Sequence, residues 1–156
     1  MIDINLLGTI AVSKAILPHF LENKNGHYVV ITSLMGKFAA PLRSSYAAAK
    51  HGLHGFFDAL RAENYKENVK VTLICPGYIR TDISKNAITA KGKGQGTMDD
   101  ATNKGMMPEV LAKKILNTVR KGKEEAVFGG TEILAVYLKR FFPSLLSKII
   151  RKAKVT

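Results

Sequence analysis

The sequence predicts an α/β protein in which parallel strands form one open sheet between layers of helices. Helical and strand-like patterns alternate along the chain, which is the order typical of such sheets. The strand-like runs are short, rich in Val and Ile and without polar alternation, as in strands buried on both faces. With 156 residues, 46% of them hydrophobic, the chain is long enough to bury one core. This composition excludes a disordered or collagen-like chain.

The expected elements follow this alternation. Apolar residues from Leu6 to Leu21 recur near 3.6-residue spacing and predict a first helix, which Asn25 and Gly26 should end by tolerating a left-handed conformation. Residues 83–106 are polar and glycine-containing and predict a long surface segment. The remaining elements are expected as a strand over residues 27–33, a helix over 45–65, a strand over 69–75, a helix over 108–121 and a strand over 126–128.

The chain is strongly basic, with 24 Lys and Arg residues against 12 Asp and Glu residues and a net charge of +12. Beyond Glu132 there is no acidic residue, and the positive residues there are Lys139, Arg140, Lys148, Arg151, Lys152 and Lys154. Residues 137–153 therefore predict a basic amphipathic helix, interrupted near Pro143. We favour packing of its apolar stripe on the domain, and the alternative is peripheral contact with an anionic membrane.

Three classes of protein are not expected. No motif typical of nucleic-acid binding accompanies the positive charge. No apolar run is judged to reach the roughly 18 residues that span a bilayer, so we expect no transmembrane helix. The lone cysteine, Cys75, excludes a disulfide scaffold and suits a reducing compartment.

Tyr46 and Lys50 lie four residues apart in the helix expected over residues 45–65. Four residues of α-helix turn through about 400° and rise about 6 Å, so the two side chains share one face. A free tyrosine has a pKa of about 10, and a lysine about 4 Å away contributes on the order of 4 kcal/mol at an effective dielectric constant of 20. Such a pair can exchange a proton near neutral pH. Taken alone, however, the spacing is more often an exposed pair on a helix surface.

Two further motifs are expected at the same edge of the sheet. Ser33 ends the first strand, and Pro76 and Gly77 end the second, with Thr81 shortly after. Because ligands of an open parallel sheet bind beyond the carboxyl ends of its strands, these residues and the start of the Tyr46 helix should face one crevice. Each motif alone could be a loop hydroxyl or simple turn punctuation. Their common edge favours a site.

These motifs carry a family resemblance. Asn5, Ser33, the Tyr-Ala-Ala-Ala-Lys run ending at Lys50 and the Pro-Gly-Tyr-Ile-Arg-Thr run ending at Thr81 resemble the motifs of the short-chain dehydrogenases/reductases. The resemblance covers the whole chain. Residues 41–51, 56–63 and 84–87 are similar to the dehydrogenase/reductase member 7 and 7B branch of that family.

The resemblance implies a role for each residue. Tyr46 would exchange a proton with the substrate oxygen while hydride moves to or from a nicotinamide. Lys50 would lower the pKa of Tyr46 and hold the nicotinamide ribose, Ser33 would orient the substrate oxygen, and Asn5 would position a water in a relay to Lys50. The cofactor-binding residues it implies are Tyr46, Lys50, Pro76, Gly77, Ile79 and Thr81.

The resemblance also implies a fold that this chain contains only in part. It is expected to be the C-terminal part of a doubly wound, Rossmann-type parallel sheet, lacking the N-terminal strands and their glycine-rich loop. Gly92, Gly94 and Gly96 follow no strand and are expected to form a flexible loop instead. The single partial domain divides into a catalytic core (1–82), a substrate-loop segment (83–106), the last helix and strand (107–130) and the basic amphipathic C-terminal helix (131–156).

The expected function is that of an NAD(P)-dependent oxidoreductase, with NADP preferred, that interconverts a small-molecule alcohol and a carbonyl. The chain alone is expected to be truncated, impaired and weak or inactive, and its full-length form homo-oligomeric. The alternative is a non-enzymatic remnant, or a basic protein that binds a membrane surface or nucleic acid. The expected location is cytoplasmic, with membrane association left open. His51 and His54 lie on one helix face without an apparent third ligand, so no metal is expected.

Overall fold

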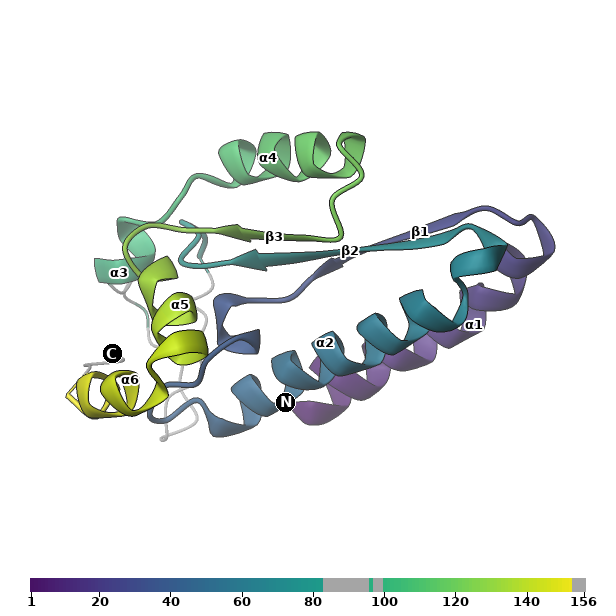
Figure 1. Cartoon of the computed structure of the whole chain (residues 1–156). Coiled ribbons are helices and arrows are strands. Elements are labelled where there is room, and N and C mark those ends of the chain that lie inside the picture. The colour runs from purple at the N-terminus through teal and green to yellow at the C-terminus, as the bar shows by residue number, and fades with distance from the viewer. Residues whose placement is uncertain (83–95, 97–99, 153–156) are drawn as a thin grey trace.

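The computed structural model describes residues 1–82, 96 and 100–152 and contains a parallel sheet in the order β1-β2-β3 (Figure 1). The strands are β1 (Gly26–Ile31), β2 (Val69–Pro76) and β3 (Glu125–Phe128). Ile31 is paired with Ile74 and Leu73 with Glu125, which aligns the carboxyl ends of the strands. The α/β fold expected from the sequence is confirmed.

Helices cover both faces of this sheet (Figure 1). One face carries α2 (Ser44–Glu63) and, beside it, the π-helical turn η1 (Asp3–Leu7) with α1 (Gly8–Glu22), whereas α4 (Pro108–Arg120) lies on the other. The C-terminal helices α5 (Ile133–Phe141) and α6 (Pro143–Ile150) lie near the carboxyl ends of the strands. Short turns of helix complete the described chain: η2 (Leu34–Gly36), η3 (Tyr65–Glu67) and α3 (Asp100–Asn103). The interruption expected near Pro143 is confirmed, since this proline begins α6.

The main core lies between the sheet and α2. Leu53 and Phe57 of α2 are buried against Leu73 of β2 and Tyr28 of β1. The Tyr28 ring contacts the Phe57 ring, and its hydroxyl donates a 2.7 Å hydrogen bond to the carbonyl oxygen of Ser13 on α1. This core fixes the direction of α2, and thereby the position of its first two turns at the carboxyl edge of the sheet.

The end of the first helix differs from the expected one. Helix α1 ends at Glu22, and the left-handed residue that follows is Lys24, with φ of 46°, rather than Asn25 or Gly26. Gly26 instead begins β1. A Cβ atom at this position would collide with the Phe20 ring, so the glycine allows the helix to pack closely on the strand. Strand β1 also ends at Ile31, two residues earlier than expected.

Strand β1 is buried on only one face in this chain, contrary to the sequence expectation. The Val29 and Ile31 side chains are 39% and 45% exposed, and among the described residues β1 pairs with β2 alone. The physical reason is that the described sheet stops at β1. Its apolar strand is therefore an edge strand whose sequence has the character of an internal one.

The expectation that no segment could span a membrane is too strong. Within the part of the chain that the structure describes, one helix qualifies by length and composition, Asp3–Glu22, with a mean hydropathy of 1.4 and 6% of the window buried. Signal sequences near the N-terminus and the mostly buried core helices of soluble proteins pass the same test of length and composition. Here Leu17, Phe20 and Leu21 pack against the main core, which is the behaviour of a helix that covers a sheet.

Candidate active site

Ser33 lies just beyond the carboxyl end of β1. The Thr32 amide continues the ladder by donating to the Ile74 carbonyl oxygen at 2.7 Å, and after this bond the chain turns into η2. The Ser33 side chain caps that turn, because its Oγ accepts a 3.1 Å hydrogen bond from the Met35 amide. Ser33 is half-buried and therefore held at this edge without being removed from solvent.

Helix α2 brings Tyr46 and Lys50 to the same edge. Tyr46 is in the first turn, and the Lys50 Nζ atom lies 5.7 Å from the centroid of its ring. The Lys50 ammonium also donates a 3.3 Å hydrogen bond to the carbonyl oxygen of Ile31, the last residue of β1. Burial lowers the pKa of Lys50 from its ordinary value. The i, i+4 spacing thus places both side chains on the face of α2 that meets the end of β1.

The turn after β2 is held by backbone and carboxylate contacts. The Gly77 amide donates to the Phe128 carbonyl oxygen at 2.6 Å, and the Tyr78 amide lies 3.4 Å from Oε1 of Glu132. A Cβ atom at position 77 would collide with that carboxylate oxygen, so glycine is required while Glu132 holds the turn. Sequence reasoning missed Glu132, because only the fold places it beside the Pro-Gly turn.

The segment after this turn runs toward the residues that are not described. Ile79 forms a parallel bridge with Met106, and the Arg80 amide donates to the Met106 carbonyl oxygen at 2.9 Å. Thr81 is exposed next to the last described residue of this segment. The glycine-rich run 92–96, apart from Gly96, and most of the expected substrate-loop segment lie outside the described residues.

Asn5 lies in the π-helical turn η1, on the helix next to α2. Its Nδ2 atom donates to the Met1 carbonyl oxygen at 3.2 Å, and its own carbonyl oxygen accepts a 3.2 Å bond from the Thr9 hydroxyl. The neighbouring Leu6 side chain fills the space over Gly52 of α2. Asn5 thus lies on an element that contacts α2. Its hydrogen bonds connect it to Met1 and Thr9, four residues before and four residues after it in the chain. Single π-helical turns occur frequently at functional sites.

Sequence reasoning missed a polar cluster between α2 and the ends of the strands, which consists of Thr32, Lys37, His54, Cys75 and Glu125. His54 Nε2 is 3.7 Å from Cys75 Sγ and 3.2 Å from the Thr32 hydroxyl, whereas His54 Nδ1 is 3.5 Å from Oε2 of Glu125. The Lys37 ammonium lies against the same carboxylate oxygen. His54, followed by Lys37, lowers the pKa of Glu125 to about 2 against the opposing effect of burial.

The sequence shows no third ligand beside His51 and His54, whereas folding brings Cys75 and Glu125 close to His54. The arrangement is nevertheless that of a polar network around the Lys37–Glu125 ion pair. The two nitrogens of the His54 ring face different groups, and a lysine already neutralises the carboxylate. Burial also raises the pKa of the Cys75 thiol, which disfavours the thiolate that a metal requires. The network ties β3 to α2 and to the turn after β1.

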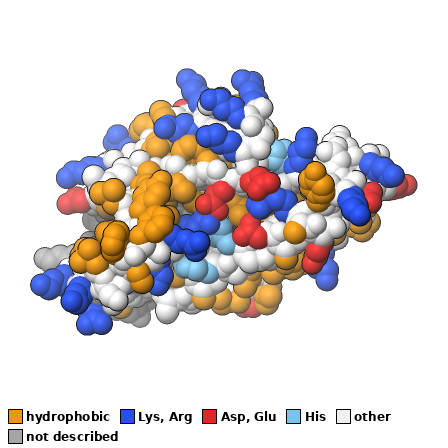
Figure 2. Space-filling view, viewed as in Figure 1, with side chains coloured by type: hydrophobic (Ala, Val, Ile, Leu, Met, Phe, Trp, Pro, Cys, Tyr) orange, Lys and Arg blue, Asp and Glu red, His pale blue; other side chains and the backbone are white. Residues whose placement is uncertain are grey.

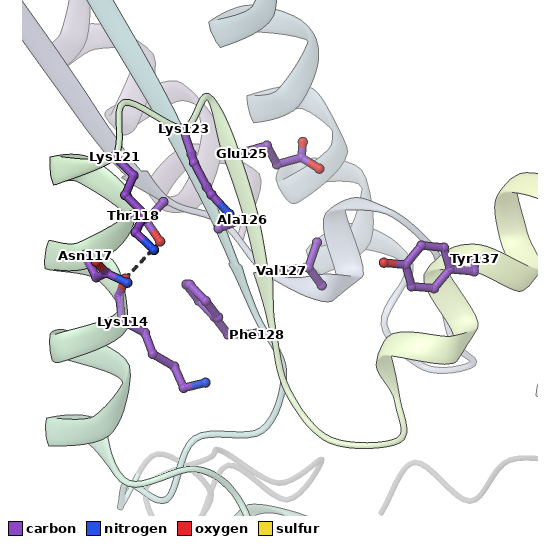
Figure 3. Close-up of a pocket in the computed structure, with 10 residues that line it drawn as sticks. All are labelled: Lys114, Asn117, Thr118, Lys121, Lys123, Glu125, Ala126, Val127, Phe128 and Tyr137. Atoms are coloured by element: carbon purple, nitrogen blue, oxygen red, sulfur yellow. Dashed lines mark hydrogen bonds between the residues drawn. The ribbon is translucent and has the colours of Figure 1, made fainter.

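A separate hollow of about 410 Å³ lies between α4 and β3 (Figure 3). Three lysines, Lys114, Lys121 and Lys123, border it, and Phe128 forms its apolar wall with the Lys114 ammonium 5.6 Å from the ring centroid. None of the residues expected at the active site lines this hollow. The candidate site is therefore the edge formed by Ser33, the start of α2 and the turn after β2.

Known proteins with similar sequences match almost the whole chain. The family model for short chain dehydrogenase matches residues 1–92. Dehydrogenase/reductase SDR family member 7B of Xenopus laevis is 42% identical over 151 residues, covering 96% of this chain and 47% of that protein. Dehydrogenase/reductase SDR family protein 7-like of Drosophila melanogaster is 39% identical, covering 97% of this chain and 47% of its own length. The chain thus spans about half the length of the curated relatives it matches.

Solved structures agree with this match. A short chain dehydrogenase from Burkholderia cenocepacia in complex with NADP superposes with a TM-score of 0.78 at 19% identity, covering 97% of this chain and 58% of that one. A 4-hydroxyisoleucine dehydrogenase complexed with NADH and succinate has a TM-score of 0.59 at 27% identity, covering 83% and 55%. With its α/β sheet, its Tyr46–Lys50 pair and these matches, the chain belongs to the short-chain dehydrogenase/reductase family.

Proposed function

We propose that this chain is the catalytic half of an NAD(P)-dependent oxidoreductase that interconverts an alcohol and a carbonyl. The observation that carries the proposal is the position of Lys50, whose ammonium bonds the end of β1 and lies 5.7 Å from the Tyr46 ring centroid. This places a cation and a phenol together at the edge where open parallel sheets bind ligands. Family membership and neighbours that bind NADP or NADH support the same function.

In this proposal each side chain has one task at the substrate oxygen. Tyr46 donates a proton to the oxygen when a carbonyl is reduced and accepts it when an alcohol is oxidised. The positive charge of Lys50 favours the ionised phenol that appears as the proton leaves. The Ser33 hydroxyl can donate to the substrate oxygen because its bond to the Met35 amide uses it as an acceptor. Asn5 positions a water that connects Lys50 to solvent.

The residues at this edge fit the nicotinamide end of the proposed cofactor. An ammonium has three N–H donors, and the Ile31 carbonyl takes one, which leaves two for ribose hydroxyls. The turn at Pro76, Gly77 and Ile79 would line the nicotinamide ring, and Thr81 would bond its carboxamide. When bound, the cofactor supplies or accepts the hydride. We propose NADP over NAD, since a solved structure with a TM-score of 0.78 to this chain is a complex with NADP.

The pyrophosphate and adenosine of the cofactor need contacts that lie outside this chain in the proposal. The chain matches about 47% of its curated relatives, so residues 1–156 alone are expected to bind the cofactor weakly and to turn over slowly. Residues 83–106 are proposed to close over a small-molecule substrate. The complete enzyme is proposed to be a homo-oligomer, located in the cytoplasm or in peripheral contact with a membrane.

The proposal is tested in a chimera in which this chain replaces the aligned part of the Xenopus laevis relative. Tyr46→Phe should lower NADPH-dependent turnover of carbonyl substrates by about a hundredfold or more, because the proton donor is lost, with little change in NADPH affinity. Lys50→Ala should lower both turnover and NADPH affinity, since two tasks meet there. Turnover is followed by nicotinamide absorbance and affinity by titration calorimetry.

The matched control is Tyr65→Phe, which removes the hydroxyl of an exposed tyrosine in η3, at the opposite end of α2 from Tyr46. It should leave both quantities unchanged. Ordinary turnover in Tyr46→Phe would remove this residue from its proposed role. A chimera that never oxidises or reduces NADP(H) would favour the alternative of a non-enzymatic remnant.

A further inference from the structure

We propose that the outer face of α5 and α6 docks on the surface of an anionic lipid bilayer. This outer face is a set of exposed apolar side chains on the two helices and on the residue that joins them: Leu134, Tyr137, Phe141, Phe142, Leu145 and Ile149. The three residues of α5 recur at i, i+3 and i+7, and Leu145 and Ile149 of α6 are four residues apart, so each set lies on one side of its helix. Figure 2 shows such side chains gathered over α5 and α6.

The opposite side of the same helices packs on the domain. Leu146 is buried against Leu34 and Phe38, and Val136, Leu138 and Ile150 extend this second core. The packing expected from the sequence is therefore present, but it uses only one stripe of each helix. Packing on the domain and contact with a membrane are consequently not alternatives, because different residues serve each.

Positive charges border the outer face. Arg140 is three residues after Tyr137, Lys148 is three residues after Leu145, and all four side chains are exposed. A shallow hollow of about 450 Å³ is lined by Lys148, Ile149, Arg151 and Lys152, which combines three cationic groups with an apolar floor. No acidic residue follows Glu132 in the chain. Each basic residue near an anionic bilayer contributes about 1 kcal/mol of attraction.

This chemistry fits a lipid surface better than a protein partner. Exposed leucine and phenylalanine side chains can enter the boundary between headgroups and acyl chains, while Tyr137 and the lysine stems keep their polar ends at the level of the headgroups. Lysine is depleted in protein interfaces relative to the rest of the surface. Lys148 and Lys152 beside Ile149 therefore favour lipid phosphates as the counter-charge.

The chain contains no tryptophan, which allows a single reporter to be placed on the outer face of the full 156-residue chain. Phe141→Trp replaces a 68% exposed residue of that face, and Tyr65→Trp replaces an 81% exposed residue of η3 as the matched control. Vesicles of phosphatidylcholine with phosphatidylserine should shift the Phe141→Trp emission to the blue and expose it to quenching by brominated lipid tails. The Tyr65→Trp emission should stay unchanged, and pure phosphatidylcholine should have little effect on either.

A charge reversal tests the electrostatic part. Lys148→Glu with Arg151→Glu in the Phe141→Trp background should weaken vesicle binding at least tenfold, whereas Lys66→Glu with Lys70→Glu, two exposed lysines around η3 and β2, should not. Added salt should weaken the binding as well. A blue shift of both reporters would indicate general adsorption and overturn the proposal. A concentration-dependent shift of Phe141→Trp without vesicles would assign this face to a second copy of the chain, and the absence of any shift would refute lipid contact.

Discussion

Acid should selectively remove a stabilising contribution made by Glu125. The carboxylate lies 3.5 Å from Nδ1 of His54 and against the Lys37 ammonium, and its pKa is about 2 instead of the usual 4.5. A carboxylate whose pKa is lowered by folding stabilises the folded state above its unfolded-state pKa. This stabilisation is therefore complete above about pH 5 and is lost as the pH falls from about 4.5 toward 2.

The difference between the two pKa values sets an upper limit on the effect. A shift of about 2.5 pKa units corresponds to roughly 3.4 kcal/mol. The Glu125 side chain is 37% exposed, so solvent screens part of the interaction, and we expect about 1–2 kcal/mol. Glu125→Gln should remove this contribution, so that the free energy of unfolding of the variant falls less steeply between pH 6 and pH 3 than that of the parent.

The measurement is urea unfolding of the chimera at several pH values, followed by circular dichroism. Glu124→Gln is the matched control, because its carboxylate is the adjacent one, is 72% exposed and has Arg61 at 3.5 Å. Its pH dependence should follow that of the parent within a few tenths of a kcal/mol. Equal pH slopes for the two variants would refute the assignment of this stabilisation to the network of His54, Lys37 and Glu125.

Two further predictions concern the turn after β2 and the edge of the sheet. In the chimera, Gly77→Ala should weaken NADPH binding by about 1–2 kcal/mol, or roughly five- to thirtyfold, because the new methyl group collides with the Glu132 carboxylate and shifts the turn after β2. Adding Glu132→Ala removes the group that the methyl meets and should restore much of the affinity measured by calorimetry, and a double variant no better than Gly77→Ala would contradict this explanation. Residues 1–156 alone should form concentration-dependent assemblies in size-exclusion chromatography with light scattering, because the outer edge of β1 is unpaired among the described residues and Val29 and Ile31 are exposed; a monodisperse monomer with a cooperative melt would count against it.

Much of the fold could be predicted from the sequence because local patterns and long-range packing agree. The runs around Tyr28 and Leu73 have the unbroken apolar character that a buried parallel strand requires, and both form neighbouring strands. Boundaries are harder to predict where side-chain packing decides them. Lys24 takes the left-handed conformation, and Gly26 is instead needed where β1 passes the Phe20 ring, a contact that no local propensity predicts.

The candidate site likewise contains residues that local spacing predicts and residues that only long-range packing brings together. The Tyr46–Lys50 pair depends on the helical repeat alone, so its common face could be predicted from the spacing of the two residues. Glu132 and Glu125 could not be found this way, because each contacts a residue far away in the sequence. Glu132 meets the Tyr78 amide 54 positions away, and Glu125 of β3 meets His54 of α2. Long-range contacts of this kind follow from strand order, which a single sequence does not specify.

The contacts of Glu132 connect the candidate site to the C-terminal helices. Its carboxylate is next to the Tyr78 amide, and the chain continues from it directly into α5. The inner stripe of α6 packs through Leu146 on Leu34, which lies one residue after Ser33. The outer face of α5 and α6 is therefore attached at two points to the edge that holds the proposed catalytic residues. If that face rests on a bilayer, the same attachments hold the proposed active site close to the membrane surface. A movement of α5 would then also move the turn after β2, because the Glu132 carboxylate contacts the Tyr78 amide of that turn.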